Sequence, residues 1–90
     1  MSILYFRLKY NLVEKTLWRD IMYPRIRDLR EDNDLNQTQV ARMLGMSQTG
    51  YSKYETGEND IPTAILIKLA RFYNTSVDYL LGETDNKDRR

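Results

Sequence analysis

The sequence predicts a small all-α domain, and three observations lead to this prediction. After residue 23, apolar side chains repeat at spacings of three and four, which is the period of an amphipathic helix. Gly45, Gly57 and Gly82 each stand just past one of these stretches, where the left-handed backbone that ends a helix carries no Cβ penalty. Within residues 37–56, two short stretches meet across a tight turn, which is the pattern of a helix-turn-helix.

The helix-turn-helix stretch, QTQVARMLGMSQTGYSKYET, carries its own small core. Val40 and Leu44 fall on one face of its first helix. Tyr51 and Tyr54 fall on one face of its second helix. Met46 lies in the turn, where its side chain can fill the space between the two helices. We therefore expect the two helices to pack directly on each other.

Local signals support both helices of this motif. Ala41 lies where the second helix would cross the first, and a larger side chain there would hold the two backbones apart. Asn36 can cap the first helix, with Gln39 three residues later to complete a capping-box-like pair. Ser47 can cap the second helix just after the turn.

The second helix of the motif carries hydrogen-bonding side chains on its outward N-terminal face. A recognition helix inserts this end into the major groove of DNA. Gln reads adenine through two hydrogen bonds, Thr offers a hydroxyl or a methyl group, and Lys reaches guanine or phosphate. Such a polar face is also typical of a plain solvated surface, but the tight turn beside it favours DNA contact. The residues are Gln48, Thr49, Ser52 and Lys53.

From Ile26 to Gly82, the chain resembles the Xre family of small bacterial and phage repressors, which is related to the lambda Cro and repressor DNA-binding domains. The resemblance rests on LNQTQVARMLGMSQTGYSKYETGENDIP followed by LIKLARFYNTSVDYLLG. It implies a five-helix, lambda-repressor-like all-α domain that binds operator DNA, commonly as a dimer, to regulate transcription. It also implies that Gln37 contacts DNA from the start of the second helix and that the four polar residues above face the groove.

Two features depart from the family pattern. Many family members carry Lys or Arg in the loop after the recognition helix, but this chain has Glu58, Asn59 and Asp60 there, so we expect a lower affinity for the DNA backbone. Asn59 is counted among the candidate DNA-binding residues. Gly50 lies inside the recognition helix, where glycine costs about 1 kcal/mol of helix stability relative to alanine; it would allow a close approach of DNA or of a neighbouring helix.

The chain has 90 residues and neither Cys nor His, which limits the functions open to it. This length allows one domain, and 41% hydrophobic content is enough for a small helical core. The absence of thiol and imidazole groups excludes disulfides, Cys/His zinc sites and catalysis by Cys or His, and it fits a reducing cytoplasm. Carboxylates are scattered over charged helical faces, without a phosphate-cradling glycine loop. We therefore expect no enzyme activity, no metal and no cofactor.

The formal net charge is only +1, so the chain is not a basic protein that coats nucleic acid. DNA affinity would have to come from an uneven distribution of charge over the surface, with basic residues gathered on one side. Arg42 and Lys53 are the first candidates for phosphate contacts, and Arg25 and Arg27 are further ones. We expect modest non-specific binding with a shallow salt dependence. The longest wholly apolar run near the start is far below the roughly 20 residues of a spanning helix, so no membrane partner is expected.

Further helices are predicted on both sides of the motif. The first begins at Pro24, because proline suits the first helical position, and it buries Ile26 and Leu29. Another helix follows Thr63 and reaches about Tyr73 as the central core helix. Its buried stripe holds Ile65, Leu66, Leu69, Ala70 and Tyr73, while Ile67 and Phe72 lie off that stripe.

The last helix is short, with Ser76 as its cap and Gly82 at its end. A helix of this length cannot bury all of its apolar residues against its own domain. We therefore predict a two-fold homodimer through Val77, Leu80 or Leu81.

The two ends of the chain differ from the DNA-binding domain, which we place at residues 24–82. In the N-terminal extension, residues 1–23, the stretch LYFRLKY alternates apolar and polar side chains like a half-buried strand. Such a strand would pair between chains or lie on the domain as an arm. Residues 83–90 are charged and lack apolar anchors, so we expect a disordered tail.

Translation from Met22 is an equally weighted alternative to a structured extension. Trp18 is encoded TGG, and if Arg19 uses AGG the pair contains GGAGG, a bacterial ribosome-binding sequence close upstream of the Met22 codon. Met22 stands directly before the first helix of the domain. On this interpretation, DNA binding does not need residues 1–21.

Taken as a whole, the sequence predicts a DNA-binding transcriptional regulator, a repressor of phage, mobile-element or bacterial origin. Its expected partners are double-stranded operator DNA and a second copy of the chain, and its expected location is the cytoplasm, on the nucleoid through operator binding. The alternative is an antitoxin or protein-interaction module with a small protein partner, which the apolar N-terminal arm would support.

Overall fold

The computed structural model describes residues 23–89 as a bundle of five α-helices, and no strand occurs among these residues. The predicted all-α, five-helix fold is thus confirmed. The predictions for residues 1–22, namely the strand or arm and the start at Met22, lie outside the described residues. The helices are α3 (Pro24–Asp32), α4 (Gln37–Leu44), α5 (Gln48–Thr56), α6 (Thr63–Phe72) and α7 (Val77–Leu81).

The predicted caps and glycine ends of α4, α5 and α7 are confirmed, whereas α6 begins at Thr63 itself, without a side-chain cap, and ends at Phe72. The Asn36 side chain accepts a hydrogen bond from the Gln39 amide at 2.8 Å, and the Gln39 side chain accepts one from the Asn36 amide at 2.8 Å. The hydroxyls of Ser47 and Ser76 cap α5 and α7 in the same way. Gly45 follows α4 in the left-handed conformation, with φ of 73°. These local contacts place the turn between α4 and α5 as predicted.

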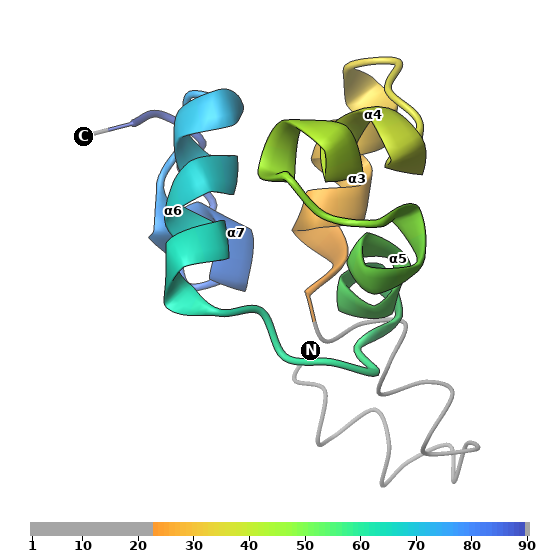
Figure 1. Ribbon diagram of the computed structural model, residues 1–90. Coiled ribbons are helices and arrows are strands. Elements are labelled where there is room, and N and C mark those ends of the chain that lie inside the picture. Colours follow the sequence, from red (N-terminus) through yellow and green to blue (C-terminus); the bar gives the residue numbers. More distant parts are fainter. Residues whose placement is uncertain (1–22, 90) are drawn as a thin grey trace, which may run out of the picture.

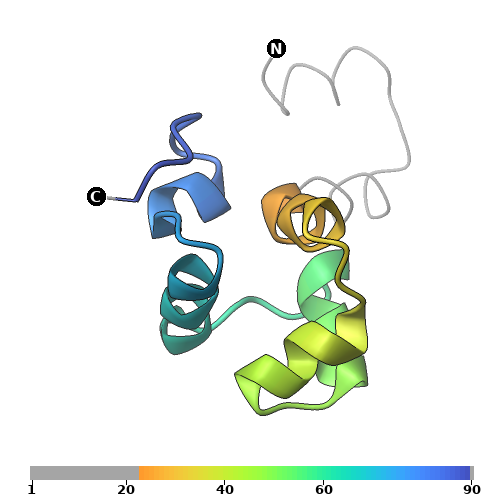
Figure 2. The ribbon, with the colours of Figure 1, turned by 90° about the horizontal axis from the view of Figure 1, so that it is seen from above.

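The helices form two groups that face each other across the core. Figures 1 and 2 show α3, α4 and α5 on one side, and α6 and α7 side by side on the other. An extended segment from Gly57 to Pro62 joins the two groups. Each helix therefore has one face toward the core and another toward solvent.

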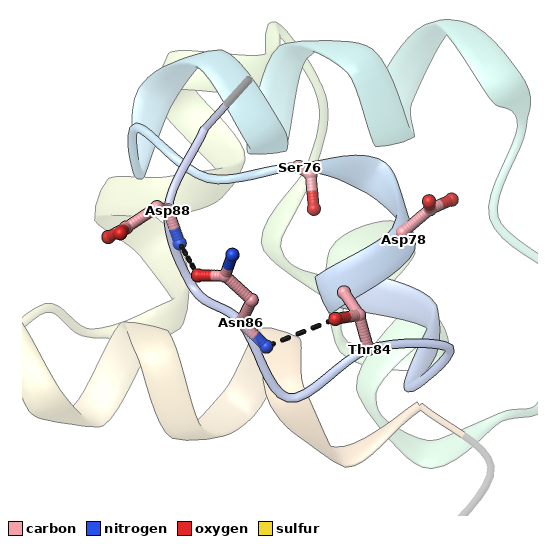
Figure 3. A pocket seen from close by; sticks show the side chains of 5 residues that line it. All are labelled: Ser76, Asp78, Thr84, Asn86 and Asp88. Atoms are coloured by element: carbon pink, nitrogen blue, oxygen red, sulfur yellow. Dashed lines mark hydrogen bonds between the residues drawn. The ribbon is translucent and has the colours of Figure 1, made fainter.

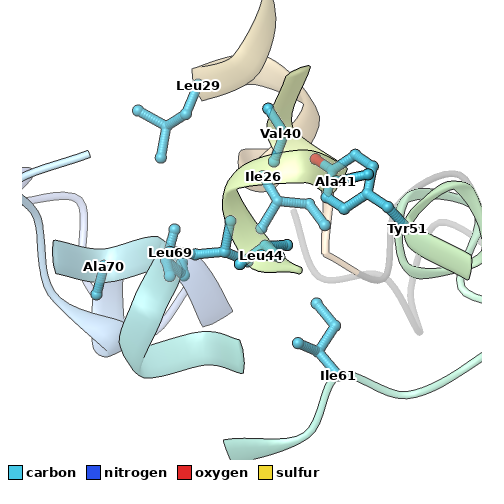
Figure 4. Close-up of a cluster of buried hydrophobic side chains, with 10 residues drawn as sticks. Ile26, Leu29, Val40, Ala41, Leu44, Tyr51, Ile61, Leu69 and Ala70 are labelled. Atoms are coloured by element: carbon cyan, nitrogen blue, oxygen red, sulfur yellow. The ribbon is translucent and has the colours of Figure 1, made fainter. Parts of the chain in front are cut away.

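The core is built from side chains of all five helices and of the connecting loop, as Figure 4 shows. Tyr51 of α5 is fully buried, as are Ile26 of α3 and Leu69 of α6. The predicted contacts within the motif are confirmed, with Tyr54 and Met46 only partly buried at its edge. The buried set is Ile26, Leu29, Val40, Ala41, Leu44, Tyr51, Ile61, Leu69, Ala70 and Leu80.

Two expectations for the C-terminal end need correction, and the first concerns the dimer residues. Leu80 is 1% exposed and belongs to the core of its own domain, so it cannot contact a second copy. Val77 and Leu81 are half-buried and keep part of their surface accessible. The helix α7 packs against α3 and α6, and Leu80 is its one buried residue.

The second correction concerns the tail. Residues 83–89 fold back on the helices instead of leaving them, because two polar side chains hold them. Arg25 of α3 pairs with the Asp85 carboxylate at 2.7 Å. The buried Thr75 hydroxyl donates a hydrogen bond to the carbonyl of Lys87 at 2.5 Å. Polar anchors thus replace the apolar ones that the tail lacks.

Candidate nucleic-acid interface

The crossing of α4 and α5 places the start of α5 at the surface. Ala41 is 1% exposed at this crossing, and its carbonyl accepts a hydrogen bond from the Met46 amide at 3.0 Å. A Cβ on Gly50 would lie 3.1 Å from the Met46 methyl and 3.1 Å from the Ser47 hydroxyl. The absence of a side chain at Gly50 therefore allows α5 to pack closely against Met46 and Ser47 in the turn before it.

The candidate DNA-binding residues lie on α5, on α4 and in the loop after α5. Gln48 and Thr49 are exposed, and Ser52 and Lys53 follow them half-buried along the same helix. The other three candidates come from neighbouring segments. Gln37 is half-buried at the start of α4, Arg42 is exposed near the end of α4, and Asn59 is exposed in the loop after α5, where its amide donates to the Lys53 carbonyl at 3.1 Å.

Two of the candidates contact each other directly. The Nε2 group of Gln48 donates a hydrogen bond to Oε1 of Gln37 at 2.6 Å. Gln37 in turn donates from its own Nε2 to Oε1 of Glu55 at 3.0 Å. The two glutamines, one from each helix of the motif, are therefore held by a third group farther along α5.

That third group belongs to a buried ion pair. Glu55 has 4% of its side chain exposed and Arg30 has 13%. Nε of Arg30 donates to Oε2 of Glu55 at 2.6 Å, and Nη2 donates to Oε1 at 3.1 Å. Arg30 also donates from Nη1 to the Leu35 carbonyl at 2.9 Å. We call Arg30, Glu55, Gln37 and Gln48 together the Glu55 network.

Glu55 is ionised in this environment. Burial alone would raise the pKa of its carboxyl, but Arg30, the nearby Tyr51 hydroxyl and Gln37 together outweigh burial and hold the pKa below the ordinary value of 4.5. The nearby Tyr51 hydroxyl is buried without a hydrogen-bond partner of good geometry. Burial raises the pKa of Tyr51, and the Glu55 carboxylate close to its hydroxyl raises this pKa further. Burial, followed by the Glu55 charge, raises the pKa of Tyr73 to about 12.

Comparison with known proteins identifies the arrangement. The helix-turn-helix family matches residues 26–80, from Ile26 in α3 to Leu80 in α7. The chain belongs to the Xre-type helix-turn-helix family. The predicted resemblance is thereby confirmed.

Three relatives show the range of this family. The uncharacterized HTH-type transcriptional regulator YobD of Bacillus subtilis is 41% identical over 64 residues, which are 71% of this chain and 57% of YobD. The cryptic phage CTXphi transcriptional repressor RstR of Vibrio cholerae is 36% identical, over 68% of this chain and 55% of RstR. The antitoxin PezA of Streptococcus pneumoniae is 33% identical, over 64% of this chain and 37% of PezA. The chain spans about half the length of the first two.

Arg25, a further candidate for phosphate contact, instead binds groups of α7 and of the C-terminal segment. The Arg25 guanidinium lies 4.1 Å from the centre of the Tyr79 ring and donates to the Tyr79 carbonyl at 2.9 Å. Its Nη2 donates to the Asp85 carboxylate at 2.7 Å. Arg25 therefore ties α3 to α7 and the C-terminal segment. Arg42 in the last turn of α4 and Lys53 in the last turn of α5 remain as basic candidates for DNA contact.

A hollow lies between the start of α7 and the C-terminal segment, and none of the candidate DNA-binding residues lines it. Figure 3 shows its hydrogen bonds from the Asn86 amide to the Thr84 hydroxyl, 3.1 Å, and from the Asp88 amide to the Asn86 side chain, 3.0 Å.

Within residues 23–89, no cluster of three His, Cys, Asp or Glu side chains could hold a metal ion. No helix of the described part is long and apolar enough to span a membrane.

The ionised state of Glu55 predicts a pH dependence of stability. Because its folded pKa is lowered, Glu55 contributes stability fully above pH 4.5 and loses this contribution as the pH falls through the folded pKa. We expect the difference in free energy of unfolding between wild type and Glu55→Gln to be largest near neutral pH and to shrink below pH 4.5. Urea unfolding at a series of pH values measures it. Glu58→Gln, which removes an exposed carboxylate, is the control, and a pH-independent difference for Glu55→Gln would contradict the prediction.

Proposed function

We propose that this chain is a sequence-specific DNA-binding transcriptional regulator, a repressor of phage, mobile-element or bacterial origin. The observation that carries the proposal is the hydrogen-bonded pair of Gln48 and Gln37 at the exposed start of α5. A helix-turn-helix presents this end of its second helix to the major groove. The regulators YobD and RstR among its relatives support the same function.

Each candidate side chain of this face suits one type of DNA contact. Gln48 has the amide needed to read adenine, and Thr49 can contact a base through its hydroxyl or methyl group. Ser52 and Lys53 come one turn later on the same face, where a hydroxyl and an ammonium group reach phosphates or base edges. Gln37, Arg42 and Asn59 border the face and are assigned to the DNA backbone.

The charge of the domain predicts that specificity depends more on base contacts than on the DNA backbone. The loop after α5 carries Glu58 and Asp60, both exposed, beside the exposed Asn59. These carboxylates repel phosphate, whereas Arg42 and Lys53 attract it. Few net phosphate contacts give a shallow dependence of affinity on salt. We propose no enzyme activity for the chain and a cytoplasmic location.

Selection of bound sites from a pool of random duplexes tests the proposal. Wild type should enrich one sequence, and Gln48→Ala should relax the preference at one base pair, since a bidentate contact contributes about 1 to 3 kcal/mol of discrimination. Replacing Gln48, Thr49, Ser52 and Lys53 together by alanine should abolish enrichment. Lys68→Ala, an exposed charge change on α6, is the control. Unchanged specificity in the fourfold variant would refute base reading by this face.

We also propose a two-fold homodimer through the accessible apolar surface of α6 and α7. Val77 lines a groove together with Ile67, and Ile67 is 39% exposed. Leu81 is half-buried close by on α7. Such a dimer would space half-sites by one DNA turn, about 34 Å. Sedimentation of wild type and Val77→Glu measures the assembly; a wild-type monomer both free and on an inverted-repeat duplex would contradict it.

A second candidate function is that of an antitoxin, and the similarity to PezA favours it. In that role the helical domain would bind DNA and a small toxin would bind elsewhere on the chain. We place the DNA-binding unit at residues 24–82 and the N-terminal extension, residues 1–23, outside it. Co-purification of a small toxin encoded beside the chain, at a fixed stoichiometry, would favour this role.

A further inference from the structure

The hydrogen bonds of the Glu55 network have only one possible direction. An ionised carboxylate accepts hydrogen bonds and donates none. Gln37 must therefore turn its amino group toward Glu55, as its 3.0 Å bond shows. This leaves the carbonyl oxygen of Gln37 toward Gln48, which must turn its own amino group toward it, at 2.6 Å.

We propose that Glu55 is a positioning residue for base recognition, because its buried carboxylate sets the amide orientation of Gln48 by way of Gln37. The proposal rests on the proposed function, since it concerns the base that Gln48 reads. Glu55 itself stays clear of DNA, with 4% of its side chain exposed. Arg30 donates hydrogen bonds to both of its oxygens.

The orientation decides which base the amide of Gln48 fits. With one amino hydrogen given to Gln37, Gln48 still presents its carbonyl oxygen as an acceptor and its second amino hydrogen as a donor. This pair matches the N6 amino group and N7 of adenine. In guanine the same carbonyl oxygen would face O6, which is also an acceptor, so the fixed orientation fits guanine poorly. A reversed amide would lose the match to adenine, because its amino group would face the N6 amino group and its carbonyl oxygen would face N7. Glu55 therefore favours adenine over guanine at this base pair.

Two variants remove the orienting group in different ways. Glu55→Gln keeps the shape but replaces the carboxylate by an amide, which can turn either side to Gln37. The double variant Arg30→Met with Glu55→Leu removes the whole ion pair, a change that is often neutral for stability because no unpaired charge stays buried. Glu58→Gln is the matched control, since it makes the same chemical change at an exposed position just after α5.

The first measurement uses the free full-length chain. NMR of the side-chain amides should show Gln37 and Gln48 ordered and in mutual contact in wild type and in Glu58→Gln. In Glu55→Gln and in the double variant, the amide of Gln48 should become mobile while the backbone spectrum stays that of a folded domain. A mobile Gln48 amide in wild type, or an ordered one in the folded double variant, would overturn the proposal.

The second measurement is the ratio of adenine to guanine at the base pair that Gln48→Ala identifies. We expect this ratio to fall about tenfold in both network variants, which corresponds to the discrimination of one good base contact, and to stay at the wild-type value in Glu58→Gln. An unchanged ratio in the folded double variant would overturn the proposal. If wild type enriches no sequence at all, the proposed function fails, and the NMR result alone decides the role of Glu55 in orienting the amide.

Discussion

Replacing Tyr51 by alanine should lower the free energy of unfolding by about 3 to 5 kcal/mol. Tyr51 is fully buried and is the largest such side chain of the domain. Its ring packs edge-on against Tyr54, with the ring centres 6.4 Å apart, and it lies beside Ala41 in the core (Figure 4). Alanine would leave a cavity that fixed helices cannot close, so most of the packing energy would be lost.

Tyr51→Phe is the matched control for this substitution. It keeps the ring and removes only the hydroxyl, which has no hydrogen-bond partner of good geometry. We expect its stability to stay within about 1 kcal/mol of wild type, because removing an unpaired buried polar group has little cost. Urea unfolding of the three proteins measures both values. A loss of similar size in the Phe and Ala variants would show that the hydroxyl, not the ring, is the stabilising group.

Glu55→Leu should be the second severe substitution, lowering the free energy of unfolding by about 3 to 5 kcal/mol. The Arg30 guanidinium would keep only its bond to the Leu35 carbonyl, with 13% of its side chain exposed. A charge buried without its partner is far costlier than the loss of the pair as a whole. Thermal or urea unfolding measures the change.

The double variant Arg30→Met with Glu55→Leu separates the cost of an unpaired buried charge from the cost of losing the ion pair. Because it buries no unpaired charge, we expect it to recover most of the stability lost in Glu55→Leu alone. This outcome would show that the ion pair serves orientation of Gln37 more than stability. A double variant as unstable as the single one would contradict that view and make the pair a net stabilising contact.

The helix ends and the turn could be predicted from the sequence because their causes are local. Asn36 and Gln39 satisfy each other's backbone across one turn. Gly45 ends α4 in a conformation that other residues adopt at a steric cost. Such hydrogen bonds join near neighbours and form whenever the helix forms, so the residue types at fixed offsets reveal them.

The allocation of apolar residues on α7 could be predicted only in part. Val77, Leu80 and Leu81 are similar in hydrophobicity, and a helix of five residues is too short for its period to single out one face. Packing against the other helices decides that Leu80 is buried while its neighbours stay accessible. The accessible pair is therefore the part of the dimer prediction that remains to be tested.

The sequence by itself determined the fold class, the helix-turn-helix and the exposed polar start of α5, because spacing and capping are written in neighbouring residues. Only the tertiary structure decided what the charged groups do. Arg30 and Glu55 stand 25 residues apart, and Arg25 and Asp85 stand 60 apart, where each could pass for an ordinary surface charge. The role of a charged side chain depends on which groups the folded helices bring within hydrogen-bond distance of it. The periodicity of the sequence carries no information about these distant neighbours.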